Sequence, residues 1–207
     1  MRHGVSTRTS ELYLKMKTSD CWSAAYELIA NGETQCAIAL CEQAPCSGLV
    51  DCQRFLGWAY YEKNNMEKAL DWFSKAAEQG DADALFGIGS VHFVQRDFRA
   101  ALPCYERAAE LGCSRAYNWI GNIYRLGLGV PRDAETALNY YRQSAAHGYL
   151  IGERALIHLT FQQGTIVNKI LAVPKFIYIL IKSAILAYRN INDERIRDIP
   201  NALAKKR

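Results

Sequence analysis

Small residues recur along this chain in a fixed register, and that register restricts the fold more than any other feature of the sequence. Glycines end successive segments at Gly48, Gly80, Gly112 and Gly148, so two units are 32 residues long and the third is 36. A second set of glycines follows nine residues after the first three. Chance placement would not preserve these offsets, so the chain is a tandem repeat of short structural units.

Each unit reads as two helices. In the first segment, residues four apart, such as Leu56 and Tyr60, define one helical face. The second segments read ALDWFSKAAEQG, ALPCYERAAELG and ALNYYRQSAAHG, with alanines placed for close helix approach beside an aromatic residue. The closing glycine ends each unit because it adopts a left-handed conformation at little cost. Helix pairs of this kind bury their apolar faces only against neighbouring pairs, which predicts an all-α solenoid of about five helix-turn-helix repeats.

The same frame divides the chain. We expect an N-terminal basic segment at 1–18, an α-solenoid at 19–190 and a C-terminal tail at 191–207. The expected repeat units are about 20–48, 49–80, 81–112, 113–148 and 149–189.

The third complete unit resembles the Sel-one-like branch of the tetratricopeptide-type repeats. Its matching positions are Ala116, Ile120-Gly121, Tyr124, Gly127-Leu128-Gly129-Val130, Asp133, Ala137, Tyr140-Tyr141, Ala145 and Gly148. The two preceding units keep the glycine, aromatic and alanine columns but lack the GLGV loop. The resemblance implies a right-handed superhelix that binds proteins or peptides, usually without catalytic activity. Bacterial members of such families often serve envelope or exopolysaccharide systems.

Catalytic chemistry is not indicated. The Gly127–Gly129 loop follows a helix, and Pro131 and Asp133 start the next one, so it is an inter-helix turn rather than a phosphate cradle. No catalytic motif accompanies the four histidines, and the spacings of the seven cysteines fit no zinc pattern. We expect no enzyme, no cofactor and no metal. A formal net charge of +4 is too small to favour nucleic-acid binding.

The cysteines and the N-terminus also bear on location. An odd number of cysteines, without an export signal in the first residues, favours reduced packing thiols. We therefore expect a cytoplasmic location, with attachment to the periphery of the inner membrane as an alternative.

A candidate binding row comes from the repeat frame. Position zero is the glycine in the middle of the first helix, at Gly57, Gly89 and Gly121, and Ile157 replaces it in the last unit. Positions −3, +1 and +4 from it point away from the core at about 100° per residue. This first-helix row carries aromatic, arginine and amide side chains but no carboxylate, a composition typical of interfaces. In solenoids of this family the row lines the concave groove, which predicts a protein or peptide partner of acidic character. For the aromatic members, packing between neighbouring first helices is the alternative. The row consists of Arg54, Trp58, Tyr61, Phe86, Ser90, Phe93, Asn118, Asn122, Arg125, Arg154, His158 and Phe161.

The stretch 170–188 is apolar nearly all round, unlike the end of a solenoid, which should be polar outside. Three alternatives follow: the tail folds over it, it forms a homodimer or partner surface, or it lies on a membrane. Two functions remain in view. The favoured one is a non-catalytic scaffold or adaptor that binds its partner in the groove. The alternative is a membrane-associated accessory or regulatory component of a bacterial envelope or exopolysaccharide system.

Overall fold

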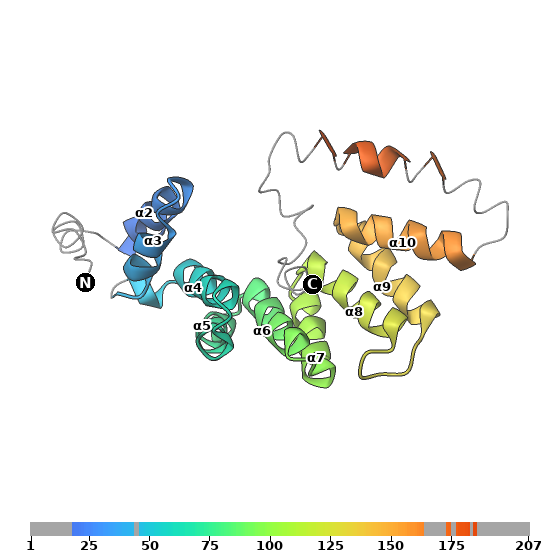
Figure 1. The fold of residues 1–207 in the computed structure, drawn as a ribbon, viewed down its shortest axis with the longest axis horizontal. Helices are drawn as coiled ribbons and strands as arrows, with labels where there is room; N and C mark the ends of the chain where they lie inside the picture. The colour runs from blue at the N-terminus through green and yellow to red at the C-terminus, as the bar shows by residue number, and fades with distance from the viewer. Residues whose placement is uncertain (1–17, 44–45, 164–172, 175–176, 183, 186–207) are drawn as a thin grey trace. The chain divides into compact units, whose positions relative to one another are not determined.

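The computed structural model describes residues 18–43, 46–163, 173–174, 177–182 and 184–185, and every secondary-structure element in these ranges is helical (Figure 1). The helices are α2 (Thr18–Ala30), α3 (Thr34–Cys41), η1 (Cys46–Gly48), α4 (Val50–Glu62), α5 (Met66–Glu78), α6 (Ala82–Val94), α7 (Phe98–Glu110), α8 (Ser114–Leu126), α9 (Ala134–Ala146) and α10 (Leu150–Gln163). Consecutive helices pack as pairs, among them α2 with α3, α4 with α5 and α8 with α9. The predicted all-α solenoid of helix pairs is confirmed.

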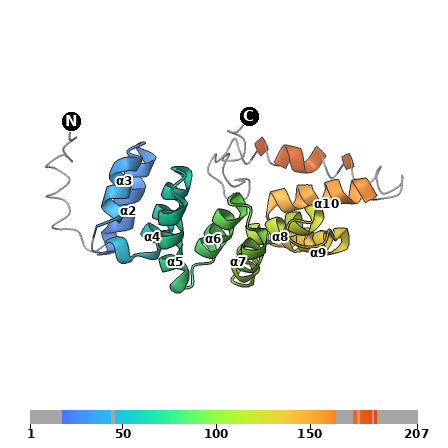
Figure 2. The same ribbon diagram turned by 60° about the horizontal axis from the view of Figure 1, so that its bottom comes forward.

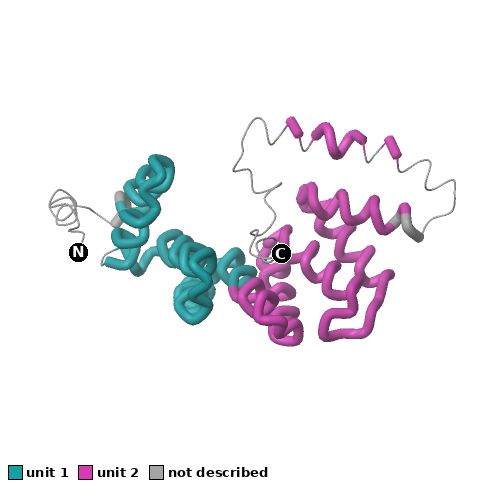
Figure 3. Tube along the Cα trace, viewed as in Figure 1, with its two compact units in different colours: residues 1–87 teal, residues 88–207 magenta. Residues whose placement is uncertain are grey.

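The chain divides into two compact units, which Figure 3 colours separately. Unit 1 is Met1–Gly87 and unit 2 is Ile88–Arg207, so the division falls inside α6. Within unit 2, α10 contacts both α9 and α8, and the three helices lie side by side in Figure 1 and Figure 2. Residues 1–17 of the predicted basic segment and the whole predicted tail lie outside the described residues, so these two segments stay predictions.

In each of the three complete repeats, the glycine in the middle of the first helix leaves room for an aromatic ring of the second helix. A Cβ atom on Gly57 would lie 2.4 Å from Cδ1 of Phe73, and one on Gly121 would lie 2.6 Å from Cε1 of Tyr141. Gly89 stands in the same relation to Tyr105, at 2.8 Å. All three rings are fully buried. The first helix can approach the second this closely only because it presents no side chain at the contact.

Alanine fills the remaining small positions of the second helices. Ala69 and Ala76 on α5 are fully buried, as are Ala101 and Ala108 on α7. On α9 the second small position is Ser144, whose hydroxyl donates to the carbonyl oxygen of Ser114 at 3.2 Å. The alanine columns expected from the sequence therefore form the contact surfaces between helices.

Local signals set the helix ends. The second helices α5, α7 and α9 each begin at an Asn or Asp N-cap whose side chain accepts from a backbone N–H of the first turn. The Asp133 cap accepts from Glu135 at 2.9 Å and from Thr136 at 3.1 Å. Gly127 ends α8 in the left-handed region, at φ +69°. The GLGV stretch is thus an inter-helix turn, as its position after a helix predicts.

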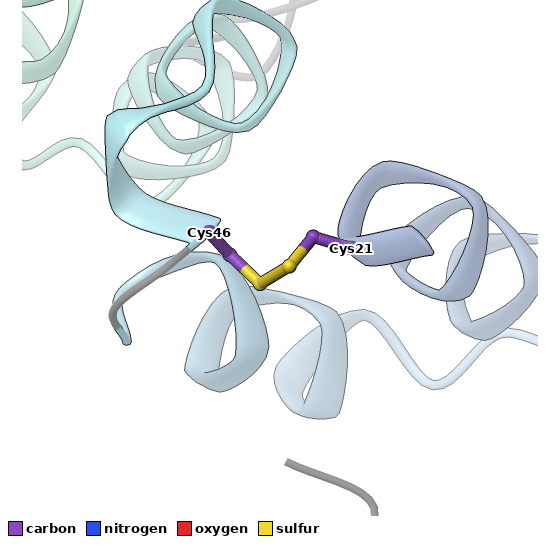
Figure 4. Close-up of a disulfide and its surroundings, with 2 residues drawn as sticks. All are labelled: Cys21 and Cys46. Atoms are coloured by element: carbon purple, nitrogen blue, oxygen red, sulfur yellow. A yellow bond between two sulfur atoms is a disulfide. The ribbon is translucent and has the colours of Figure 1, made fainter. Parts of the chain in front are cut away.

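The expectation that the cysteines are reduced packing thiols is wrong for two of them. Cys21 on α2 and Cys46 in η1 form a disulfide, with their Cα atoms 5.5 Å apart (Figure 4). Both residues are buried, at 0% and 2% exposed. The two cysteines are separated by 25 positions in sequence, and packing of the first helix pair brings them together. Counting cysteines could not reveal this pairing because it depends on the tertiary contact.

Candidate partner-binding surface

The first-helix row falls into both compact units. Arg54, Trp58 and Tyr61 lie on α4 and Phe86 on α6, all in unit 1. The other members lie in unit 2, on the remainder of α6 and on α8 and α10: Ser90, Phe93, Asn118, Asn122, Arg125, Arg154, His158 and Phe161. Each unit is therefore considered separately.

The aromatic members of unit 1 pack against one another. Phe86 is fully buried and Tyr61 is 2% exposed. Trp58 meets Tyr61 edge-on with ring centroids 5.5 Å apart and lies 6.3 Å from Phe86. It also meets Phe73 edge-on at 5.0 Å. These rings join α4 to the next first helix, which is the packing alternative stated for them. Burial raises the pKa of Tyr61 to about 12.

Arg54 already has carboxylate partners. Its guanidinium pairs with Asp51, one turn earlier on α4, and with Asp81, at the start of the next unit. Asp81 also accepts from the backbone N–H of Ala84. The guanidinium thus links two consecutive repeats. Both carboxylates lie in compact unit 1, so the positive charge of Arg54 is balanced there. This local neutralisation makes Arg54 a weak candidate for holding an acidic ligand.

In unit 2, the +1 residues of α6 and α8 each meet the hydroxyl of a buried ring. The Tyr105 hydroxyl donates to Ser90 Oγ at 3.4 Å, and the Tyr141 hydroxyl donates to Asn122 Oδ1 at 2.8 Å. In unit 1 the corresponding pair is Trp58 and Phe73, where neither side chain supplies such a hydroxyl. The residue at +1 is therefore polar where the buried ring is a tyrosine, and aromatic where the ring is a phenylalanine. Sequence reasoning missed this link, although the paired columns were available to find it.

Arg125 is held by neutral groups. Its Nε donates to the Tyr141 hydroxyl at 3.1 Å and its Nη2 donates to Asn122 Oδ1 at 3.4 Å. No carboxylate pairs with Arg125 in the part of the chain that the structure describes. Burial raises the pKa of Tyr141, while the Arg125 charge and hydrogen bond act in the opposite direction. The Arg125 guanidinium is thus held in one orientation, and no carboxylate among the described residues neutralises its charge.

The neighbouring first helix adds further polar and aromatic side chains. Arg154 and His158 on α10 are exposed, and Phe161 is 43% exposed. Arg154, like Arg125, has no ion-pair partner among the described residues. Because α8 and α10 are in contact, we group the accessible members of the row as the α8–α10 face. It consists of Asn122, Arg125, Arg154, His158 and Phe161.

Three other members of the row in unit 2 are committed to packing at least in part. Phe93 meets Trp119 edge-on at 4.8 Å and is partly buried, while Ser90 is 2% exposed. Asn118 is also 2% exposed, and its Oδ1 accepts no hydrogen bond within the described ranges. Asn118 is thus buried, whereas Asn122 and Arg125 are half-buried.

The apolar stretch 170–188 lies partly outside the described residues. Where it is described, Ile179 is buried and Lys182 pairs with Glu153 of α10 at 3.6 Å. Its exposed apolar side chains are Val173, Ile177, Tyr178, Leu180, Ile181 and Ile185. None of the helices described is both long enough and apolar enough to span a bilayer. Tail cover, homodimer and membrane contact stay predictions for this stretch.

The described residues bring together no group of three or more His, Cys, Asp and Glu side chains that could hold a metal ion. The sequence-predicted row separates into three groups. The buried side chains are Tyr61, Phe86, Ser90 and Asn118, the half-buried ones engaged in packing or ion pairs are Arg54, Trp58 and Phe93, and the remainder form the α8–α10 face.

Comparison with protein families agrees with the repeat frame. The family model described as Sel1 repeat matches residues 50–81, 84–113 and 114–149. These matches begin at α4 and end just before α10.

A curated relative is similar over part of the chain. An uncharacterized protein of Neisseria meningitidis serogroup B is 34% identical over 95 residues, which are 44% of this chain and 20% of that protein. The chain thus matches about a fifth of the length of this relative.

Solved structures share the fold. A Sel1 repeat protein from Oxalobacter formigenes superposes with a TM-score of 0.64 at 24% identity, covering 87% of this chain and 84% of its own. YrrB, a tetratricopeptide protein described as having an unusual peptide-binding site, superposes with a TM-score of 0.55 at 19% identity, covering 83% of this chain and 91% of its own.

Proposed function

The chain is a Sel1-repeat protein, and from this premise we propose that it is a non-catalytic adaptor that binds an acidic protein or peptide segment on the α8–α10 face. Repeats of this kind commonly mediate protein–protein interaction. The structural neighbour YrrB carries a peptide-binding site on the same type of fold.

Arg125 is the observation that carries the proposal. An arginine held by Tyr141 and Asn122 has lost side-chain freedom before any ligand arrives, so binding would cost less entropy. Because its partners are neutral, its charge remains available to a carboxylate, which guanidinium groups bind in a planar, bidentate manner. Asn122 beside it offers an amide suited to a peptide backbone. Arg154 on α10 extends the positive character of the face.

The direct test is binding to an array of synthetic peptides, acidic and basic, matched in length. We expect the acidic peptides to bind. Arg125→Glu should weaken the tightest of them by about 10- to 100-fold, since a hydrogen bond to a charged group contributes roughly 1.5–3 kcal/mol. Fluorescence anisotropy with labelled peptide measures the change.

The matched control is Arg142→Glu. Arg142 is exposed on α9 and donates to Asn139 at 2.8 Å, so the same charge reversal occurs away from the face. Arg154→Glu provides a second probe at an exposed position of the face. Equal losses for Arg142→Glu and Arg125→Glu, a preference for basic peptides, or unchanged affinity in both face variants would each overturn the proposal.

The location belongs to the proposal as well. From the sequence we predict a cytoplasmic adaptor, with attachment to the periphery of the inner membrane as the alternative. The Cys21–Cys46 disulfide counts against a reducing compartment, because cytosolic thiols are kept reduced. Trapping thiols in intact cells by alkylation, before lysis, would show whether this pair is oxidised where the protein resides.

A further inference from the structure

An aromatic patch in unit 1 lies outside the α8–α10 face. Trp22 and Tyr26 stand four residues apart on α2, so they share one side of that helix. Their ring centroids are 6.5 Å apart, and the Trp22 ring lies 6.2 Å from the ring of Phe55 on α4. Helix α2 contacts α4, and Figures 1 and 2 show the two side by side. We call the surface formed by Trp22, Tyr26 and Phe55 the α2–α4 face.

This patch continues the first-helix row into the helix pair that precedes the matched repeats. Ala25 lies 32 residues before Gly57 and is fully buried, so it takes the central small position of α2. Positions −3 and +1 from Ala25 are Trp22 and Tyr26. Sequence reasoning began the row at α4, because the first pair has alanine where the later repeats have glycine.

Exposure distinguishes this end of the row from the aromatic residues that follow. Tyr61 and Phe86 are buried by neighbouring helices, whereas Tyr26 is 63% exposed. Trp22 and Phe55 are half-buried and support the Tyr26 side of the patch. Apolar side chains that are exposed together, rather than singly, mark interaction sites. Tyrosine and tryptophan are also enriched in the centres of protein interfaces.

The disulfide holds the patch in place. Cys21, the residue before Trp22, is bonded to Cys46 in η1, and η1 contacts α4. The α2 half of the patch is therefore linked covalently to the segment that leads into the α4 half. A surface restrained in this way loses less conformational freedom when a ligand binds.

The charges around the patch are negative. Residues 18–53 contain no Lys, Arg or His, so five carboxylates give a formal net charge of 0 − 5 = −5; they are Asp20, Glu27, Glu33, Glu42 and Asp51. Glu27 follows Tyr26 on α2, both side chains are exposed, and Glu27 forms no ion pair among the described residues. The first cation after this stretch, Arg54, pairs with both Asp51 and Asp81, so that group of three carries a net charge of −1.

We propose that the α2–α4 face binds an arginine- or lysine-bearing segment of a partner protein. A guanidinium or ammonium group is attracted to the face of an aromatic ring, and a surface of negative potential raises the local concentration of cations. The same potential repels an acidic segment. The protein then has two surfaces of opposite preference, since Arg125 and Arg154 make the α8–α10 face positive. This inference goes beyond the proposed function and does not depend on it.

The experiment measures binding of two labelled peptides to the full-length chain by fluorescence anisotropy. One peptide alternates arginine with serine, and the other alternates glutamate with serine at the same length. We expect the arginine peptide to bind and to dissociate as salt is added, because salt screens exposed charges. Its affinity should be lower than that of the acidic peptide, because a cation–ring contact at an exposed site contributes less than a charged hydrogen bond.

Variants of Tyr26 separate ring recognition from apolar contact. Tyr26→Leu keeps an apolar side chain but removes the ring, so the dissociation constant of the arginine peptide should rise about 2- to 5-fold. Tyr26→Phe keeps the ring and should bind as the wild type does. Because Tyr26 is exposed, both variants should fold, and unchanged binding of the acidic peptide at unit 2 would verify this.

A charge reversal tests the electrostatic part. Glu27→Lys should weaken the arginine peptide, whereas Glu78→Lys should not, because Glu78 is exposed on α5, which supplies no residue to the face. Equal losses in these two variants, or unchanged affinity in Tyr26→Leu, would overturn the proposal. So would self-association of the wild type in sedimentation that Tyr26→Leu abolishes, since a second copy would then cover the face.

The two binding surfaces can fail separately. Arg125→Glu should weaken only the acidic peptide, and Tyr26→Leu should weaken only the arginine peptide. Loss of the arginine peptide in Arg125→Glu with no loss in Tyr26→Leu would place the basic ligand in unit 2 and overturn the assignment to the α2–α4 face.

Discussion

At the scale of single residues, the buried aromatic ring of each repeat determines which kind of residue occupies the +1 position of the facing first helix. Phe73, Tyr105 and Tyr141 occupy equivalent positions, yet only the tyrosines have a hydroxyl to satisfy. A buried hydroxyl without a partner is costly, so a polar residue is placed at its end. In the third unit that residue is Asn122, and the same hydroxyl also orients Arg125. The repeat's own packing thus creates the proposed anchor.

Tyr61 predicts a pH dependence at this scale. Burial raises its folded-state pKa to about 12, above the value of about 10 for an unfolded chain. Below pH 10 the phenol is protonated in both states, and stability is fully retained. Between pH 10 and 12 the unfolded chain releases the proton first, so the free energy of unfolding falls by at most about 1.4 kcal/mol per pH unit.

Urea titrations at intervals from pH 9 to 12 would measure this loss. The Tyr61→Phe variant lacks the ionisable hydroxyl, so the difference between variant and wild type isolates its contribution from other groups. An identical alkaline loss in both proteins would contradict the assignment to Tyr61.

At the scale of helices, two kinds of glycine serve different purposes. Gly57 lies in the middle of α4, where a Cβ would collide with the buried Phe73 ring. Gly80 follows α5 at φ +86°, with open space where a Cβ would stand. The first glycine permits a close approach between helices, and the second permits the backbone to leave the helix.

Alanine substitutions should separate the two roles. Gly57→Ala should destabilise unit 1 by about 1–3 kcal/mol, because the ring cannot move without disturbing the core. Gly80→Ala should cost about 1 kcal/mol, from the left-handed backbone alone. Urea unfolding followed by far-ultraviolet circular dichroism gives both values. A larger effect at Gly80 than at Gly57 would show that helix termination, rather than helix approach, limits stability.

At the scale of the whole molecule, each helix pair depends on its neighbours, and the first pair is additionally cross-linked. The Cys21–Cys46 bond closes a loop of 25 positions, and closing such a loop restricts the unfolded chain. We expect the double variant Cys21→Ser and Cys46→Ser to lose about 3 kcal/mol of stability in unit 1.

Hydrogen exchange with mass spectrometry provides the local readout. Amides of α2 and α3 should lose protection in the double variant, while those of α8 and α9 should keep it. Cys104→Ser, which removes a thiol that is not disulfide-bonded, serves as the control. Uniform loss of protection along the chain would mean that the bond supports more than its own corner.

The helix pairs, the alanine columns and the helix start at Asp133 could be predicted because each depends on residues close in sequence, repeated in a fixed register. The contact of Gly121 with the Tyr141 ring was visible only in the structure. The binding row was only partly predictable. Helical geometry identified which side chains leave the core of their own pair, but Tyr61, Phe86, Ser90 and Asn118 are buried. Neighbouring helices cover them, and that coverage is a long-range property.

By itself, the sequence determined that this protein is a series of helix pairs, because a repeated spacing of small and apolar residues permits no other way to bury them. Only the tertiary structure decided which charges are neutralised and which sulfurs meet. Arg54 pairs with Asp81 of the next repeat, Arg125 contacts neutral partners among the described residues, and Cys21 is bonded to Cys46. These outcomes depend on distances between residues far apart in the chain, which no local pattern encodes.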